Sequence, residues 1–119
     1  MAELSPETIT GYHAHIYYDE ASREFAAGLR DRIGELFEVH LGRMHDVPVG
    51  PHPSSMYQIA FAPDQYAAFT PWLMLNRGGL MVFLHPETGD ELANHTDHAT
   101  WMGAILELDT SVLEHDPDD

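Results

Sequence analysis

Apolar and polar residues alternate in residues 12–18, YHAHIYY, which predicts a strand with two distinct faces. Neighbouring side chains of a strand point to opposite sides, so His13 and His15 share one face with Tyr17. The other face carries Tyr12, Ala14, Ile16 and Tyr18. The more apolar face is expected to pack on helices, which leaves the two histidines on the open face of the sheet.

Two later segments have the three- and four-residue spacing of amphipathic helices. The first follows Ser22, a good capping residue, and is expected to end near Gly42. Its apolar stripe consists of Phe25, Leu29, Ile33, Leu36 and Phe37. The second begins near Pro63, and Pro71 is expected to break or restart it. Its apolar residues are Tyr66, Phe69, Trp72, Leu73 and Leu75.

The remaining apolar segments complete a β-α-β-β-α-β order. Residues 43–49 predict an edge strand, 56–61 a central strand and 80–84 a buried strand. A short helix over 96–103 and a last strand over 105–108 form a C-terminal extension. This order predicts an α+β, ferredoxin-like sandwich in which two helices cover one face of a four-stranded antiparallel sheet.

This fold brings residues from distant segments together. We expect strands 12–18 and 56–61 to be central, parallel neighbours, with 80–84 antiparallel beside 12–18. The starts of the two central strands and the end of 80–84 then lie at one edge of the sheet. Four histidines meet at this edge: His13, His15, His52 and His85. The open face also carries Met56, Ala60, Met81 and Phe83, an apolar set that predicts a homodimer.

Composition narrows the classes of function. The 119 residues suggest a single domain over 1–119, and the absence of cysteine excludes disulfides and thiolate metal sites. Twenty acidic residues face five arginines and no lysine, so the formal charge is −15 and nucleic acid is not an expected partner. The first ten residues do not resemble a signal peptide, and no apolar run reaches the ~20 residues of a membrane helix. We therefore expect a cytoplasmic protein without a membrane partner.

Nine histidines are the main candidates for chemistry, because imidazole is the commonest metal ligand and acid–base group in proteins. Neutral imidazoles with apolar neighbours suit a first-row divalent metal. Asp97, Asp90 and Glu87 are the carboxylates available to orient the rings or to join them as a ligand. Any single histidine is more often a surface or core residue, and His40, His95 and His115 are assigned to that class.

Three segments resemble the DOPA 4,5-dioxygenase family: YHAHIYY, LGRMHDVPVGPHPSSMYQIAF and WLMLNRGGLMVFLHPETGDELANHTDHATWMG. The resemblance extends over residues 11–103 and is specific in combination. It implies a ferredoxin-like fold and extradiol cleavage of a catechol such as DOPA with O₂. It also implies a non-haem metal, usually Fe(II), with Zn or Mn as alternatives. The histidines that match the family are His13, His15, His52, His85 and His98.

We assign a role at the metal site to each of these histidines. We expect His15, His52 and His85 to bind the metal, with His13 as a fourth ligand or a close catalytic neighbour. His98 lies on a separate loop and is expected to be the catalytic acid–base. A site of two histidines and one carboxylate is an equally open alternative. The main alternative function is a non-catalytic, dimeric module that binds a metal or a small molecule. An oxygen-independent hydrolase or isomerase is less favoured, because no nucleophile arrangement is evident.

Overall fold

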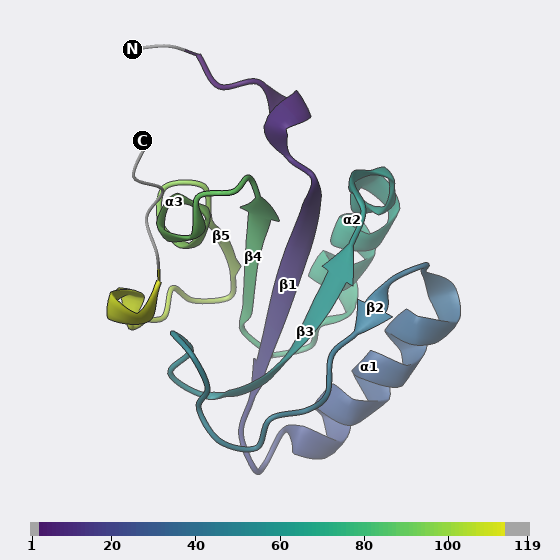
Figure 1. Ribbon diagram of the computed structural model, residues 1–119. Coiled ribbons are helices and arrows are strands. Elements are labelled where there is room, and N and C mark those ends of the chain that lie inside the picture. The colour runs from purple at the N-terminus through teal and green to yellow at the C-terminus, as the bar shows by residue number, and fades with distance from the viewer. Residues whose placement is uncertain (1–2, 114–119) are drawn as a thin grey trace.

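A five-stranded antiparallel sheet in the order β2-β3-β1-β4-β5 forms the centre of the computed structural model, which describes residues 3–113 (Figure 1). The strands are β1 (Gly11–Tyr18), β2 (His40–Leu41), β3 (Ser55–Phe61), β4 (Val82–Glu87) and β5 (Thr100–Met102). The α-helices are α1 (Arg23–Leu36), α2 (Tyr66–Asn76) and α3 (Glu91–His95). Short 3-10 helices are η1 (Pro6–Thr8), η2 (Pro63–Gln65) and η3 (Thr110–Val112). Within residues 3–113, no helix has the length and apolar character needed to cross a membrane.

Helices α1 and α2 cover one face of this sheet, so the predicted α+β, ferredoxin-like fold is confirmed, with one more strand than expected. Ala14 and Ile16 of β1 are fully buried and pack with Ile33 of α1 and Phe69 of α2. Val82 of β4 joins the same core. The two-residue period of β1 and β4 therefore places alternate side chains in the helix-covered core, and directs the histidines of both strands to the other face.

The relative direction of the central strands differs from the prediction. β1 pairs with β3 in antiparallel register, and the expectation that strands 12–18 and 56–61 run parallel was wrong. The reason is that β3 follows β2 as its antiparallel neighbour, and so returns between β2 and β1. His13 lies opposite His85 across the β1–β4 pair, as expected. The start of β3 lies at the other end of the sheet, so His52 reaches this face from the loop that precedes β3.

Several predicted boundaries in the first half were also wrong. α1 ends at Leu36, well before Gly42, and the side chains of Phe25 and Leu36 are exposed. Ala26 is buried in α1 instead, on the same face as Leu29 and Ile33. Residues 43–49 form only an isolated bridge between His45 and Met56, while β2 lies earlier in the chain.

The second half departs from the prediction for local reasons. Pro71 lies inside α2 without ending it; its position is exposed, so water can reach the carbonyl that the proline leaves unbonded. A helix forms at α3 rather than over 96–103, since the Asp90 carboxylate accepts a hydrogen bond from the Ala93 amide and caps it. The predicted helix over 96–103 is replaced by β5, and residues 105–108 are not a strand.

A second apolar cluster covers part of the open face. Phe83 is fully buried and Met56 nearly so, because Trp101, Leu106 and Leu108 from the C-terminal segment pack against them. Tyr17 belongs to the same cluster. The apolar face that motivated a homodimer is thus covered within one chain. The homodimer remains a prediction, but an exposed apolar face no longer supports it.

Gly103 tests how closely the C-terminal segment packs. Its φ is +93°, and a Cβ atom built there would lie 2.6 Å from the Met81 sulfur. We expect Gly103→Ala to lower the free energy of unfolding by about 1–3 kcal/mol, measured by urea denaturation. The matched control is Gly28→Ala in α1, where a Cβ meets nothing within 4 Å. It should raise stability by about 0.5–1 kcal/mol, and equal effects of the two substitutions would contradict this description.

Candidate metal centre

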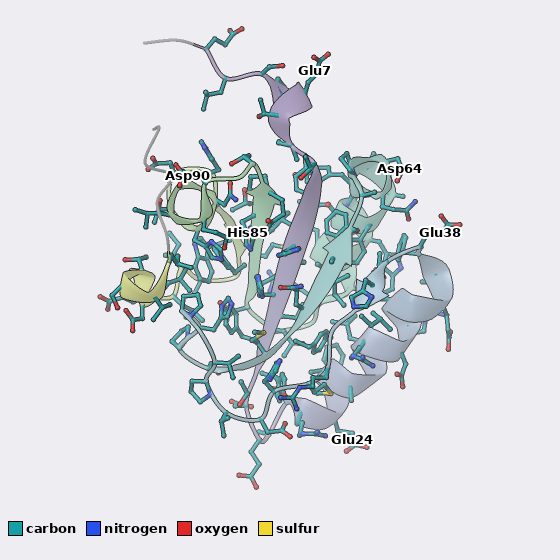
Figure 2. The ribbon with its side chains drawn as sticks, in the orientation of Figure 1. Glu7, Glu24, Glu38, Asp64, His85 and Asp90 are labelled. Atoms are coloured by element: carbon teal, nitrogen blue, oxygen red, sulfur yellow. The ribbon has the colours of Figure 1, made fainter. Side chains whose placement is uncertain are left out.

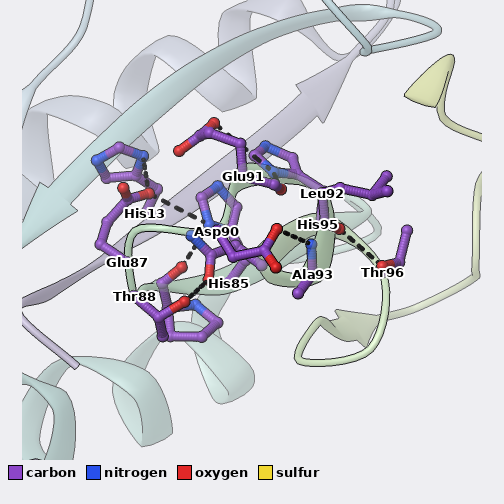
Figure 3. A network of polar contacts seen from close by, with 12 residues as sticks. His13, His85, Glu87, Thr88, Asp90, Glu91, Leu92, Ala93, His95 and Thr96 are labelled. Atoms are coloured by element: carbon purple, nitrogen blue, oxygen red, sulfur yellow. Dashed lines mark hydrogen bonds and ion pairs between the residues drawn. The ribbon is translucent and has the colours of Figure 1, made fainter. Parts of the chain in front are cut away.

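Three histidines meet on the open face where β1 pairs with β4. His13 and His15 extend from β1 and His85 from β4, and one ring nitrogen from each lies within 4.8 Å of the others. The Nε2 atoms of His15 and His85 are 3.1 Å apart. Figure 2 places His85 at β4, between α3 and β1, and Figure 3 shows the polar groups around it. We call His13, His15 and His85 the histidine triad.

Polar contacts hold two rings of the triad. His85 Nδ1 is 3.0 Å from the carbonyl oxygen of Pro86, which can only accept, so Nδ1 carries the proton and Nε2 keeps its lone pair. His13 Nδ1 lies 3.1 Å from a Glu87 carboxylate oxygen (Figure 3), a charge contact without hydrogen-bond geometry. Carboxylates and carbonyls that fix an imidazole in this way commonly stand behind metal-binding histidines.

Burial keeps the triad neutral at pH 7. Desolvation, with a contribution from neighbouring histidines, lowers the pKa of His15 well below its ordinary value. Burial lowers the pKa of His85 to about 3, although the Pro86 carbonyl partly opposes this. The pKa of His13 is lowered for the same first reason, and less so because Glu91 is near. Neutral imidazole is the form that binds a metal ion.

The triad fits a divalent metal ion. Two imidazole nitrogens that each lie about 2.0–2.1 Å from one ion are separated by about 3 Å, which matches the spacing of the His15 and His85 Nε2 atoms. Within the described residues, Nδ1 of His15 is buried and has no hydrogen-bond partner, so this ring is not committed to another protein group through that atom. Three neutral imidazole donors suit Fe or Zn and leave room for further ligands.

His52, the third predicted ligand, lies beside the triad in a different role. Its ring centre is 4.2 Å from that of His15, and its Nδ1 is 2.6 Å from the Tyr17 hydroxyl. The Tyr17 side chain is buried and the structure gives its hydroxyl no other acceptor, so the phenol donates to Nδ1. Burial raises the pKa of Tyr17 and lowers that of His52 to about 4. Neutral His52 then carries its proton on Nε2, where it offers a donor rather than a lone pair.

His95, which the sequence analysis assigned to the surface or core, belongs to this group of rings. It is 7% exposed, and its ring centre is 4.1 Å from that of His85. Its Nδ1 donates to the Glu91 carbonyl oxygen at 2.7 Å, which holds the ring at the end of α3. The signal that could have found it is Asp90, a capping residue from which a short helix ending at His95 could be predicted. His40 is exposed, and His115 lies outside the described residues.

His98 does not contact the triad in the described part of the chain. It lines a cavity of about 850 Å³ together with Asp97, Tyr12 and Tyr66. Residues of the helix-covered core, such as Leu84, and residues of α3, such as Ala93, both line this cavity, and His85 is the member of the triad that it includes. The function proposed below therefore rests on the triad and not on this cavity. The role of His98 as an acid–base remains a prediction.

The carboxylates considered as ligands have separate positions. Glu87 contacts His13 at 3.1 Å and lies 3.4 Å from His85 Nδ1, so it stands behind the rings as a partner. Burial, followed by the charge of Glu91, raises the pKa of Glu87. Asp90 caps α3, and Asp97 lies with His98 at the cavity. In the described residues, the metal-sized group therefore consists of histidines alone.

Comparison with known proteins agrees with this arrangement. The model of the Dopa 4,5-dioxygenase family matches residues 12–112. The chain belongs to this family. The match contains β4, the triad and all of β1 except Gly11, so the predicted family resemblance is confirmed.

The chain is similar to two curated proteins and to one solved structure. It is 32% identical to the DOPA 4,5-dioxygenase of Amanita muscaria, covering 88% of the chain and 50% of that protein. It is 39% identical to an uncharacterized 21.2 kDa protein of Botryotinia fuckeliana, covering 87% and 63%. A crystal structure of a candidate dioxygenase from Nostoc punctiforme superimposes with a TM-score of 0.91 at 49% identity, covering 92% of this chain and 96% of that one. The chain thus spans between half and two thirds of the two curated relatives.

Proposed function

We propose that this protein is a metal-dependent extradiol dioxygenase that opens the ring of a catechol, such as DOPA, with O₂. The observation that carries this proposal is the convergence of three neutral histidines on the open face of the sheet. The family match and the Amanita relative support the reaction class. We further propose that the 119 residues act as one domain and that the protein works in the cytoplasm.

The triad would hold the metal, with Fe(II) as the first candidate and Zn or Mn as alternatives. When bound, the metal supplies a positive charge that can hold both catechol oxygens and O₂. Glu87 and the Pro86 carbonyl keep His13 and His85 oriented. Burial of His15 and His85 excludes water from the inner side of the site. His52 and His98 are the remaining groups of this chain to which we assign roles.

His52 is proposed as a fixed hydrogen-bond donor. With Nδ1 occupied by Tyr17, its Nε2–H can stabilise negative charge that develops on a substrate oxygen. His98 is proposed, from the sequence, as the group that takes and returns a catechol proton. His52 as a further ligand is the competing assignment, which requires it to release the Tyr17 hydroxyl.

Oxygen uptake tests the proposed function. Metal-free protein is loaded anaerobically with Fe(II), Zn(II) or Mn(II), and a panel of catechols is then supplied with O₂. Fe(II)-loaded protein should consume oxygen only when a catechol is present, whereas metal-free protein should consume none. Metal binding without any oxygen uptake across the panel would favour the non-catalytic binding module instead.

Tyr17→Phe tests the hydrogen bond behind His52. Removing the hydroxyl frees His52 to carry its proton on Nδ1, so the Nε2 donor is only partly retained. We expect kcat to fall by about tenfold, the value of one buried hydrogen bond, with KM and metal content nearly unchanged. Tyr18→Phe is the matched control, because Tyr18 donates instead to Asp46 and the His45 carbonyl. If Tyr17→Phe loses its metal while Tyr18→Phe keeps it, Tyr17 supports the residues that bind the metal instead.

A further inference from the structure

The accessible side of the triad is bordered by two carboxylates. His15 and His85 are buried, while the side chain of His13 is 29% exposed and that of Glu87 26% exposed. Glu91 is 48% exposed, and its carboxylate lies 4.0 Å from His95 Nδ1. Figure 3 shows this carboxylate between the rings of His13 and His95. A molecule that approaches from the side of His13 therefore passes Glu87 and Glu91.

No side-chain cation balances these carboxylates. The chain has no lysine and five arginines. Four arginines bind other groups: Arg23 binds Asp46, Arg30 the Gly42 carbonyl, Arg32 Glu35, and Arg77 the Leu80 carbonyl. The fifth, Arg43, follows β2 at the far edge of the sheet from β4. A substrate carboxylate would thus meet repulsion at the mouth of the site and find no arginine to bind it.

We propose that Glu91, with Glu87 behind it, selects catechols by the charge of their side chain, favouring an ammonium group and disfavouring a carboxylate. This inference rests on the proposed function, since it concerns what reaches the same triad. In the proposed reaction the catechol hydroxyls would bind a metal held by the triad, so the substituent on the ring would extend toward the mouth of the site. Glu87 already contacts His13, which leaves Glu91 as the carboxylate with a free, solvent-facing side.

Calorimetry with Zn(II)-loaded protein measures this selection without turnover. The probes are 4-(2-aminoethyl)catechol, neutral 4-propylcatechol and 3,4-dihydroxyphenylacetate, at low salt. We expect the amine to bind about 3- to 10-fold tighter than the neutral probe, and the acid about 3- to 10-fold weaker. Raising the salt concentration should narrow both gaps, because the charges are partly exposed.

Two variants and one control assign the effect to Glu91. Glu91→Gln should remove most of the preference for the amine and leave the affinity for 4-propylcatechol unchanged. Glu91→Arg should reverse the order of amine and acid. The control Glu24→Gln removes the same charge from the start of α1, far from His85 in Figure 2, and should change nothing.

The outcomes separate this inference from the proposed function. Tight binding of 4-propylcatechol with no discrimination by charge, or tighter binding of the acid, overturns the selection while the catechol site stands. Failure of every probe to bind the Zn(II)-loaded protein overturns both. An equal effect of Glu24→Gln and Glu91→Gln also overturns it, because net charge alone would then explain the preference.

Discussion

Replacing His85 with alanine is expected to remove metal binding and oxygen uptake together. His85 shares the closest nitrogen pair of the triad, and its ring is fixed by the Pro86 carbonyl. Without the His85 ring, two imidazoles remain, and the site loses the metal-binding nitrogen that faces His15. We expect at least a ~100-fold loss of Fe(II) affinity, measured by anaerobic titration and elemental analysis. Catechol-dependent oxygen uptake should fall to the level of metal-free protein.

Because His85 is buried, its replacement also needs a test of folding. Circular dichroism and urea denaturation of His85→Ala show whether the chain remains folded. His13→Ala removes a part-exposed member of the triad, so it should lower metal affinity with little loss of stability. The control is His40→Ala, an exposed histidine on β2 that should keep full metal content. A folded His85→Ala and a folded His13→Ala that both retain metal would place the site elsewhere.

Replacing His52 with alanine is expected to slow turnover by about 10²–10³ while metal content stays near one ion per chain. A decrease of this size in turnover is expected when one preorganised hydrogen-bond donor is removed from a site where negative charge develops during the reaction. Single-turnover kinetics with Fe(II)-loaded protein and a saturating catechol measure it separately from binding. His52→Gln, which keeps an N–H donor of similar reach, should recover part of the rate.

The same experiment with His98→Ala decides between roles. A proton-transfer role predicts a decrease of about 10²–10⁴ in turnover with metal retained. If only His98→Ala is slow, the donor role of His52 is wrong. If His52→Ala loses the metal, His52 is a ligand, as first expected from the sequence, and the Tyr17 hydrogen bond is broken in the metal-bound protein.

The sequence predicted the sheet, its two covering helices and the face on which His13, His15 and His85 lie. These follow from side-chain periodicity, which is local and is preserved in β1 and β4. It did not predict the direction of β3 relative to β1. That direction depends on how β2 and β3 turn, and residues 43–54 contain little regular structure from which to infer it.

The histidine neighbourhood was predicted only in part for a related reason. His52 reaches the triad because its loop crosses the open face, not because its strand begins there. His95 was missed because α3 has only five residues, too few to show the apolar spacing of a helix. Such contacts are set by tertiary packing and capping, which residue spacing alone does not encode.

The most direct test of a metal-dependent extradiol reaction at the triad is the fate of ¹⁸O₂. Fe(II)-loaded protein, given a catechol and ¹⁸O₂, is followed by oxygen uptake and by mass spectrometry of the product. The account predicts one O₂ consumed per ring opened, and a ring-opened product that contains both oxygen atoms before exchange with water. It also predicts that His85→Ala makes none of this product. Fully metal-loaded wild-type protein that leaves both the catechol and the oxygen unchanged would contradict it.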